Sequence, residues 1–131
     1  MTFITPLPAL TREVVLFDLD GTLSESEPGI TGSLVHAFTA AGLPVPSQAQ
    51  LRTAIGPDFV DIFPLLGVPV EQVDVVIGHY RARYEHTGLF ETRLYDGIGE
   101  LLAALRHAGC ELAVASAKPE TSAVRVIEHL G

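Results

Sequence analysis

Two short apolar runs mark the predicted strands of this chain. Val14 to Phe17 and Leu112 to Ala115 are unbroken rather than alternating, which is typical of strands covered on both faces in a parallel α/β sheet. Each run ends in a polar turn, and ligands of such sheets bind beyond the carboxyl ends of the strands. The pattern therefore predicts two parallel strands, at about residues 13–17 and 111–116, whose polar turns face one crevice.

Helical spacing of apolar residues covers most of the remaining chain. It predicts a helix over residues 97–108, before the second strand, and another from Pro119 to the C-terminus. Residues 24–93 contain no convincing strand but three helical patterns, at about residues 30–41, 47–55 and 71–86. Prolines cluster in the expected connections, at Pro44, Pro46, Pro57, Pro64 and Pro69. We expect an α/β fold with a helical insertion, preceded by an irregular arm over residues 1–12.

Composition and charge exclude several functions. Sixteen acidic residues against eight Lys and Arg give a formal net charge of −8, which repels phosphodiester backbones and argues against nucleic-acid binding. No apolar run approaches the ~18 residues of a membrane-spanning helix. Met1 to Leu10 lacks the basic residues of a secretory signal, and the single Cys110, expected to be a buried inert thiol, allows no internal disulfide. A cytoplasmic protein is the expectation.

The chemistry-bearing segment follows the first strand directly. In Asp18-Leu19-Asp20-Gly21-Thr22, persisting strand geometry turns Asp18 and Asp20 to the same side. Two carboxylates this close require that one holds a proton or that a hard cation such as Mg²⁺ lies between them. Both options suit phosphoryl transfer. Asp18 would attack phosphorus to form an aspartyl phosphate, while Asp20 would protonate the leaving alkoxide and later deprotonate water.

Two structural alternatives compete with this interpretation. A calcium-binding EF-hand loop also opens with Asp-x-Asp, but counted from Asp18 its sixth position is Leu23 instead of Gly and its twelfth is Gly29 instead of Glu. That alternative fails at both positions. The other is that the two aspartates only cap a turn after a strand, and it stays open.

The chain resembles the haloacid dehalogenase superfamily, in its phosphoglycolate-phosphatase-like branch with a helical cap. The resemblance rests on residues 17–23 (FDLDGTL) and 112–120 (LAVASAKPE), supported by residues 55–57 and 80–97. It implies a Rossmann-like, doubly wound parallel sheet, here a partial core over residues 1–23 and 94–131, with a mobile cap over residues 24–93. It also implies that Asp18 is the nucleophile and a metal ligand. Asp20 is then the acid/base and lends its backbone carbonyl to Mg²⁺, and Ser116 hydrogen-bonds the phosphate.

The residues after the second strand allow two interpretations each. Ser116 either caps the following helix or, since it ends the second strand, faces the same crevice as Asp18. Lys118, the only lysine, is either a solvated loop residue or a counter-charge for phosphate. We expect Thr22 and Ala117 to belong with them to the substrate site. The family's catalytic lysine normally comes later, so Lys118 is not assigned that role.

The predicted cap limits the choice of chemistry. Residues 24–93 contain no lysine, which excludes the Schiff-base cleavage of phosphonates, and Asp20 favours an oxygen leaving group over a halide. Residues 58–61 are acidic and apolar where related phosphatases often carry a basic residue, which argues against phosphoglycolate itself as the substrate. The cap arginines are either solvated or supply a substrate-binding cation: Arg52, Arg81, Arg83 and Arg93.

Two strands are too little sheet to stand alone and leave a hydrophobic edge at Val14–Phe17. Family members continue into segments that carry the catalytic lysine and a further acidic metal ligand. We therefore expect the amino-terminal portion of a longer Mg²⁺-dependent phosphatase, acting on a small phosphorylated metabolite. The alternatives are a phosphomutase, or an inactive fragment that serves as a binding or assembly module and self-associates through its open sheet edge.

Overall fold

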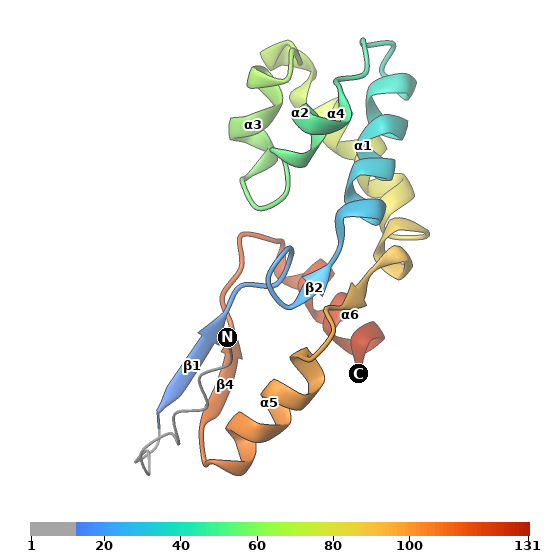
Figure 1. Ribbon diagram of the computed structural model, residues 1–131. Coiled ribbons are helices and arrows are strands. Elements are labelled where there is room, and N and C mark those ends of the chain that lie inside the picture. The colour runs from blue at the N-terminus through green and yellow to red at the C-terminus, as the bar shows by residue number, and fades with distance from the viewer. Residues whose placement is uncertain (1–12) are drawn as a thin grey trace.

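The computed structural model describes residues 13–131 of the 131-residue chain (Figure 1). The arm predicted over residues 1–12 lies outside the described residues. In chain order the elements are β1 (Val14–Phe17), β2 (Ser24–Glu25), α1 (Glu27–Ala40), α2 (Gln48–Arg52), α3 (Phe59–Leu65), the 3-10 helix η1 (Val70–Gln72), α4 (Val73–Tyr84), the 3-10 helix η2 (Gly88–Glu91), β3 (Arg93–Leu94), α5 (Ile98–His107), β4 (Glu111–Val114) and α6 (Glu120–Leu130).

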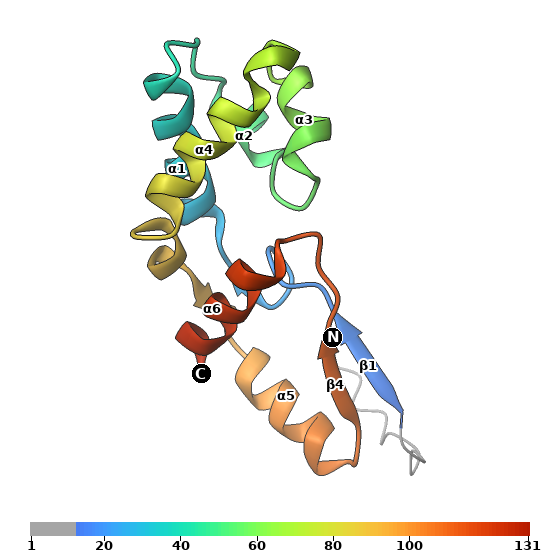
Figure 2. The same cartoon turned by 180° about the vertical axis from the view of Figure 1, so that it is seen from behind.

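The elements form two parts joined at a narrow waist (Figures 1 and 2). We call α1 to α4 the helical part, and β1, β4, α5 and α6 the sheet part. The predicted helical patterns are confirmed as α1, α2, α4, α5 and α6. Within the described residues, no helix is long and apolar enough to cross a membrane.

The sheet part is built on a parallel pair of strands. β1 and β4 align from Val14 opposite Glu111 to Phe17 opposite Val114, as the apolar runs predict, so both strands end at the same edge. Coverage on both faces is wrong for the described chain, because Val14 and Leu16 are 57% and 64% exposed. Among residues 13–131 no strand pairs with the other side of β1. The open hydrophobic edge is therefore found as expected.

A second, very short sheet links the two parts. β2 and β3 are antiparallel, with Ser24 opposite Leu94 and Glu25 opposite Arg93. The prediction of no strand in residues 24–93 is wrong at both ends of that range. Two-residue strands are too short to produce a hydrophobic period, and they form because the two chain crossings between the parts run side by side (Figure 1).

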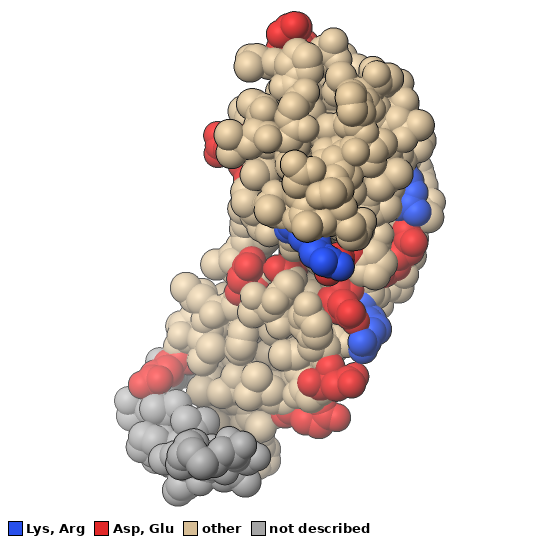
Figure 3. Space-filling model, turned by 45° about the horizontal axis from the view of Figure 1, so that its top comes forward, with Lys and Arg blue, Asp and Glu red and all other residues tan. Residues whose placement is uncertain are grey.

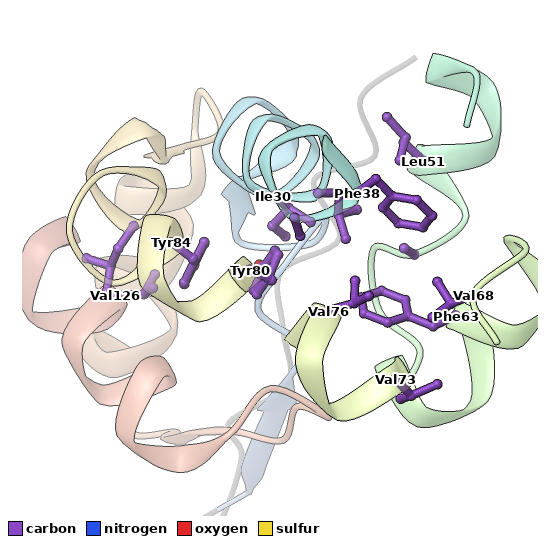
Figure 4. Packing of buried hydrophobic residues seen from close by; sticks show 14 of the residues in the cluster. Ile30, Phe38, Leu51, Phe63, Val68, Val73, Val76, Tyr80, Tyr84 and Val126 are labelled. Carbon is purple, nitrogen blue, oxygen red and sulfur yellow. The ribbon is translucent and has the colours of Figure 1, made fainter. Parts of the chain in front are cut away.

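Aromatic side chains from three helices form the core of the helical part (Figure 4). Phe63 of α3 is fully buried, with its ring edge-on to Phe38 of α1 at 6.0 Å and stacked on Phe59 at 4.7 Å. Phe59 meets Tyr80 of α4 edge-on at 4.6 Å. These contacts pack α3 against the pair formed by α1 and α4, which lie directly on each other.

Helix α3 is not predicted by the helical spacing, and Pro64, expected in a connection, lies inside it. Proline in a helix interior costs roughly 3 kcal/mol because it removes a hydrogen bond and clashes with the preceding turn. The helix forms nonetheless because Asp58 caps it, accepting a hydrogen bond from the Val60 amide, and because Phe63 is buried in the aromatic core. Tertiary packing overrides the local preference here.

Two glycines allow α1 to approach η2 closely. A Cβ atom added at Gly29 would lie 2.1 Å from the carbonyl oxygen of Gly88, and one added at Gly88 would lie 2.6 Å from Ser33 Oγ. Polar contacts also hold α1 and η2 together through α4. Arg83 donates a hydrogen bond to Ser33 Oγ at 3.0 Å and forms an ion pair with Glu91 at 2.9 Å. Glycine is therefore required where the helical part meets the segment that returns to the sheet part.

We expect Gly29→Ala to lower the free energy of unfolding by about 2 kcal/mol, because the added methyl group collides with rigid backbone. Gly78→Ala is the matched control, since Gly78 lies in α4 with no atom near its missing Cβ, and alanine there should raise stability by up to about 1 kcal/mol. Urea denaturation followed by circular dichroism measures both. Equal changes for the two variants would show that the close contact is not maintained in solution.

Candidate active site

A cavity of about 320 Å³ lies between the sheet part and the helical part. Its lower wall is the edge at which β1 and β4 end, where α/β sheets bind ligands. Its upper wall comes from α4 and from the segment that leads into α3. The lining residues are Asp18, Asp20, Ile30, Ala54, Gly56, Pro57, Asp58, Phe59, Val60, Ile77, Tyr80, Arg81, Tyr84, Ser116, Ala117, Lys118, Pro119 and Ser122.

Both predicted carboxylates line this cavity. Asp18 follows the last residue of β1; it is exposed, and its Oδ1 accepts a hydrogen bond from the Leu19 amide at 2.8 Å. Asp20 lies deeper and its side chain is 9% exposed. The turn between Asp20 and β2 requires glycine, since Gly21 has a φ of +78°. Local backbone geometry thus places both aspartates at the same cavity.

Lys118 is not a solvated loop lysine, because its side chain is only 7% exposed. Its ammonium group lies 2.9 Å from Asp20 Oδ2 and 4.6 Å from the centre of the Tyr84 ring. Burial by itself lowers the pKa of the ammonium. The neighbouring Asp20 and Tyr84 outweigh that effect and raise the pKa of Lys118 above its ordinary 10.5. The lysine is therefore charged and joins a sheet-part carboxylate to a helical-part ring.

The ion pair between Lys118 and Asp20 supplies a positive charge beside the two neighbouring carboxylates. Two close carboxylates were expected to need a shared proton or a divalent cation, yet a cation is already present as the Lys118 ammonium on Asp20. The sequence offers no signal for the contact, because Asp20 and Lys118 are 98 residues apart. The pairing of β1 with β4 brings them together.

Tyr84, which helical spacing marks only as an apolar position, is a further polar group in the cavity. It is the last residue of α4, is 3% exposed, and stacks on Tyr80 at 5.3 Å. Its hydroxyl is buried and has no hydrogen-bond partner. Burial raises the pKa of this hydroxyl although the Lys118 ammonium opposes the shift, so at neutral pH the group is protonated and can donate.

Of the remaining predicted site residues, two line the cavity and one does not. Ser116 and Ala117 line the cavity, and Ser116 Oγ accepts a hydrogen bond from the Lys118 amide at 3.1 Å. Ser116 does not cap α6, because that helix begins at Glu120 with Pro119 as its N-cap residue. Its hydroxyl hydrogen thus stays available for an acceptor in the cavity. Thr22 is exposed on the turn after Asp20 and does not line the cavity.

Of the four arginines weighed as substrate-binding cations, three are held in ion pairs: Arg52 with Glu27, Arg83 with Glu91, and Arg93 with Glu25 and Asp96. Arg81 has no ion-pair partner within the described residues and lines the cavity from α4. Figure 3 shows basic and acidic side chains gathered side by side where the two parts meet. Only tertiary structure separates Arg81 from the other three.

The cavity also contains donors suited to a metal ion. Asp18 and Asp20 present carboxylates, and Asp20 Oδ1 is buried without a hydrogen-bond partner. Mg²⁺ keeps several water ligands and is held by one or two carboxylates, so this donor set fits it. Over residues 13–131 there is no group of three or more His, Cys, Asp or Glu side chains able to hold a metal. Any metal here would depend on water or on groups beyond these two carboxylates.

Curated relatives of this chain include enzymes with different names. The chain is 41% identical over 124 residues to the tyrosine-protein kinase PtkA of Mycobacterium tuberculosis, covering 95% of this chain and 42% of that protein. It is 40% identical over 122 residues to a 5'-nucleotidase of Pseudomonas aeruginosa, covering 92% and 55%. A phosphoglycolate phosphatase of Agrobacterium fabrum is 37% identical over 128 residues, covering 90% and 53%. The chain spans about half the length of the curated relatives it matches.

The fold agrees with these relatives. The crystal structure of a predicted phosphatase from Clostridium acetobutylicum superimposes with a TM-score of 0.83 at 35% identity, covering 90% of this chain and 55% of that one. Residues 15–131 match the family model described as haloacid dehalogenase-like hydrolase. With that match over most of its length, the chain belongs to the haloacid dehalogenase-like hydrolase family.

Proposed function

We propose that this protein is a Mg²⁺-dependent phosphatase that hydrolyses a small phosphomonoester through an aspartyl phosphate on Asp18. The observation that carries the proposal is that Asp18, Asp20, Ser116 and Lys118 line one cavity at the shared end of β1 and β4. Two carboxylates, a hydroxyl donor and an ammonium group are what phosphoryl transfer to a carboxylate requires. The phosphatase names of several relatives support the same class of reaction.

In the first half of the proposed reaction, an oxygen of the exposed Asp18 carboxylate attacks phosphorus. The bond from phosphorus to the leaving oxygen breaks, and that oxygen takes a proton from Asp20, which must first receive one from solvent because it is ionised while it pairs with Lys118. In the second half, water loses a proton to Asp20 and attacks the aspartyl phosphate. The bond between phosphorus and Asp18 breaks, which releases inorganic phosphate and restores both carboxyl groups.

Ser116 and Lys118 would bind the phosphoryl oxygens. The Ser116 hydroxyl has a free hydrogen, and the Lys118 ammonium, now on Asp20, has further N–H groups for a second acceptor. Mg²⁺, held by the Asp18 carboxylate and the Asp20 backbone carbonyl, would screen the repulsion between phosphate and carboxylate. Asp20 Oδ1 faces no protein donor, which leaves that oxygen to handle the proton.

The helical part would act as the cap that selects the leaving group. In this proposal the domain division is the one expected from the sequence, in which residues 24–93 would be the cap and the rest of the chain would belong to the core. The cap wall is largely apolar, with Phe59, Ile77 and Tyr80, and it adds Arg81, which has no ion-pair partner among residues 13–131. The glycolate group is small and polar and makes few contacts with an apolar surface, whereas the base and ribose of a nucleoside would cover that surface. Nucleoside 5'-monophosphates are therefore the first substrates to test, in line with the relative named 5'-nucleotidase.

We expect Arg81→Met to lower kcat/KM for guanosine 5'-monophosphate about tenfold, because the guanidinium would lose its hydrogen bonds to acceptors on the base. Ribose 5-phosphate, which has no base, should be hydrolysed by Arg81→Met as by the wild type. Arg52→Met is the control, since Arg52 is a paired surface arginine outside the cavity. Loss of activity toward both substrates alike would place Arg81 on the phosphate and contradict its role with the base.

The relative named tyrosine-protein kinase supplies a second candidate function, phosphorylation of protein tyrosine. It is separated from hydrolysis by incubating the protein with Mg²⁺ and either p-nitrophenyl phosphate or ATP with a tyrosine-containing polypeptide. Release of p-nitrophenol without phosphotyrosine supports the phosphatase, and the reverse result supports the kinase. Neither product, from a well-folded sample, would support the alternative of an inactive binding or assembly module.

A further inference from the structure

The buried oxygens without partners converge on one cavity. Among the described buried side chains, three polar atoms have no hydrogen-bond partner: Asp20 Oδ1, Ser26 Oγ and the Tyr84 hydroxyl. Asp20 and Tyr84, the residues that carry two of these three atoms, line the same cavity from opposite parts of the molecule. A buried polar group left unpaired costs about 1–3 kcal/mol, so native structures rarely keep one without a reason. A ligand in the cavity supplies that reason for both atoms.

The Tyr84 ring is held in a fixed place by its neighbours. It stacks on Tyr80 at 5.3 Å, and the Lys118 ammonium lies 4.6 Å from its centre. The same ammonium is 2.9 Å from Asp20 Oδ2, so one charged group separates the ring from the predicted acid/base. Since the ring is fixed, the hydroxyl is not free to turn toward solvent for a partner.

The chemistry of the hydroxyl indicates which ligand atom would pair with it. A protonated phenol donates one strong hydrogen bond, and the oxygens of a phosphoryl group accept such bonds. The sheet part offers the Ser116 hydroxyl and the Lys118 ammonium as further donors at the same cavity. An ionised Asp20 carboxylate could accept a hydrogen bond from the phenol, but Asp20 Oδ1 and the Tyr84 hydroxyl both have no partner and so are not bonded to each other.

We propose that Tyr84 is a substrate-binding residue whose hydroxyl donates a hydrogen bond from the helical part to an oxygen of the substrate's phosphoryl group. The proposal rests on the proposed function, since it assumes that phosphate occupies this cavity. It adds that the phosphate site is completed by the helical part, because the donors Ser116 and Lys118 come from the sheet part and the third donor, Tyr84, comes from α4. Phosphate binding would therefore be coupled to the position of the helical part relative to the sheet part.

The test uses the natural protein at its full natural length. Mg²⁺ is present, and inorganic phosphate is the probe. Tyr84 is one of the three tyrosines in this chain, so comparison of the wild type with Tyr84→Phe isolates its near-ultraviolet absorption. Phosphate should produce a tyrosine difference spectrum in the wild type. Tyr84→Phe, which keeps the stacked ring, should lose that spectrum and bind phosphate about tenfold more weakly. Tyr95→Phe, at an exposed site outside the cavity, should keep both properties.

The rise in melting temperature on adding phosphate, measured within each variant, separates binding from any change in basal stability. A smaller rise for Tyr84→Phe than for the wild type and Tyr95→Phe supports the proposal. Equal affinity and an equal rise for Tyr84→Phe and the wild type would overturn it while leaving the proposed function intact. A wild type that neither binds phosphate nor hydrolyses any phosphomonoester would refute the proposed function itself, and this inference with it.

Discussion

Phosphatase activity is expected to fall roughly a thousandfold or more when Asp18 is replaced by asparagine, because a neutral amide oxygen cannot attack phosphorus as a carboxylate does. The fold should be unaffected. Asp18 is exposed, and its Oδ1 accepts a hydrogen bond from the Leu19 amide that the side-chain oxygen of asparagine can also accept. Hydrolysis of p-nitrophenyl phosphate measures the loss, and melting temperature confirms that the variant is folded.

The matched control for this prediction is Asp74→Asn, which removes one exposed carboxylate from the first turn of α4, outside the cavity. It should keep full activity. Rapid acid quenching of the wild type should trap a phosphorylated protein that Asp18→Asn does not form. Activity retained in Asp18→Asn would rule out Asp18 as the nucleophile and would move the search to another group in the cavity.

Replacement of Lys118 by methionine is expected to lower the free energy of unfolding by about 3 kcal/mol, because it leaves the Asp20 carboxylate without its counter-ion in a place that is 9% exposed. The loss arises from the orphaned charge more than from the missing attraction. The double variant Asp20→Asn/Lys118→Met should therefore be more stable than Lys118→Met alone. Chemical denaturation of the wild type, both single variants and the double variant gives the coupling energy.

The pH dependence of this difference follows from the raised pKa of Lys118. A basic group whose pKa is higher in the folded state contributes its full stabilisation below its ordinary pKa of 10.5 and loses it as pH rises through the folded value. The stability gap between wild type and Lys118→Met should thus be constant near neutral pH and narrow above pH 10.5. A gap that stays unchanged at alkaline pH would mean that the charge of Lys118 is not what stabilises the fold.

Local pattern was sufficient for the elements that are long or continuous. The run Val14–Phe17 predicts a strand because unbroken apolar residues fit a pleated, buried surface, and it pairs in parallel with Glu111–Val114 as expected. The longer helices follow from their apolar spacing. The pattern fails for α3 and for the β2–β3 ribbon, since a helix with an internal proline and strands of two residues depend on contacts with distant residues.

The sequence by itself determined that Asp18 and Asp20 follow a strand, that Ser116 follows the strand paired with it, and that the chain belongs among α/β proteins with a site at that edge. These properties are local, because they depend on residues a few positions apart and on the direction of a strand. Tertiary structure alone decided that Lys118 pairs with Asp20, that Tyr84, with its unpaired hydroxyl, lines the same cavity, and that Arg81 of α4 also lines it. Those contacts join residues far apart along the chain, and their geometry is set by how the helical part packs on the sheet part.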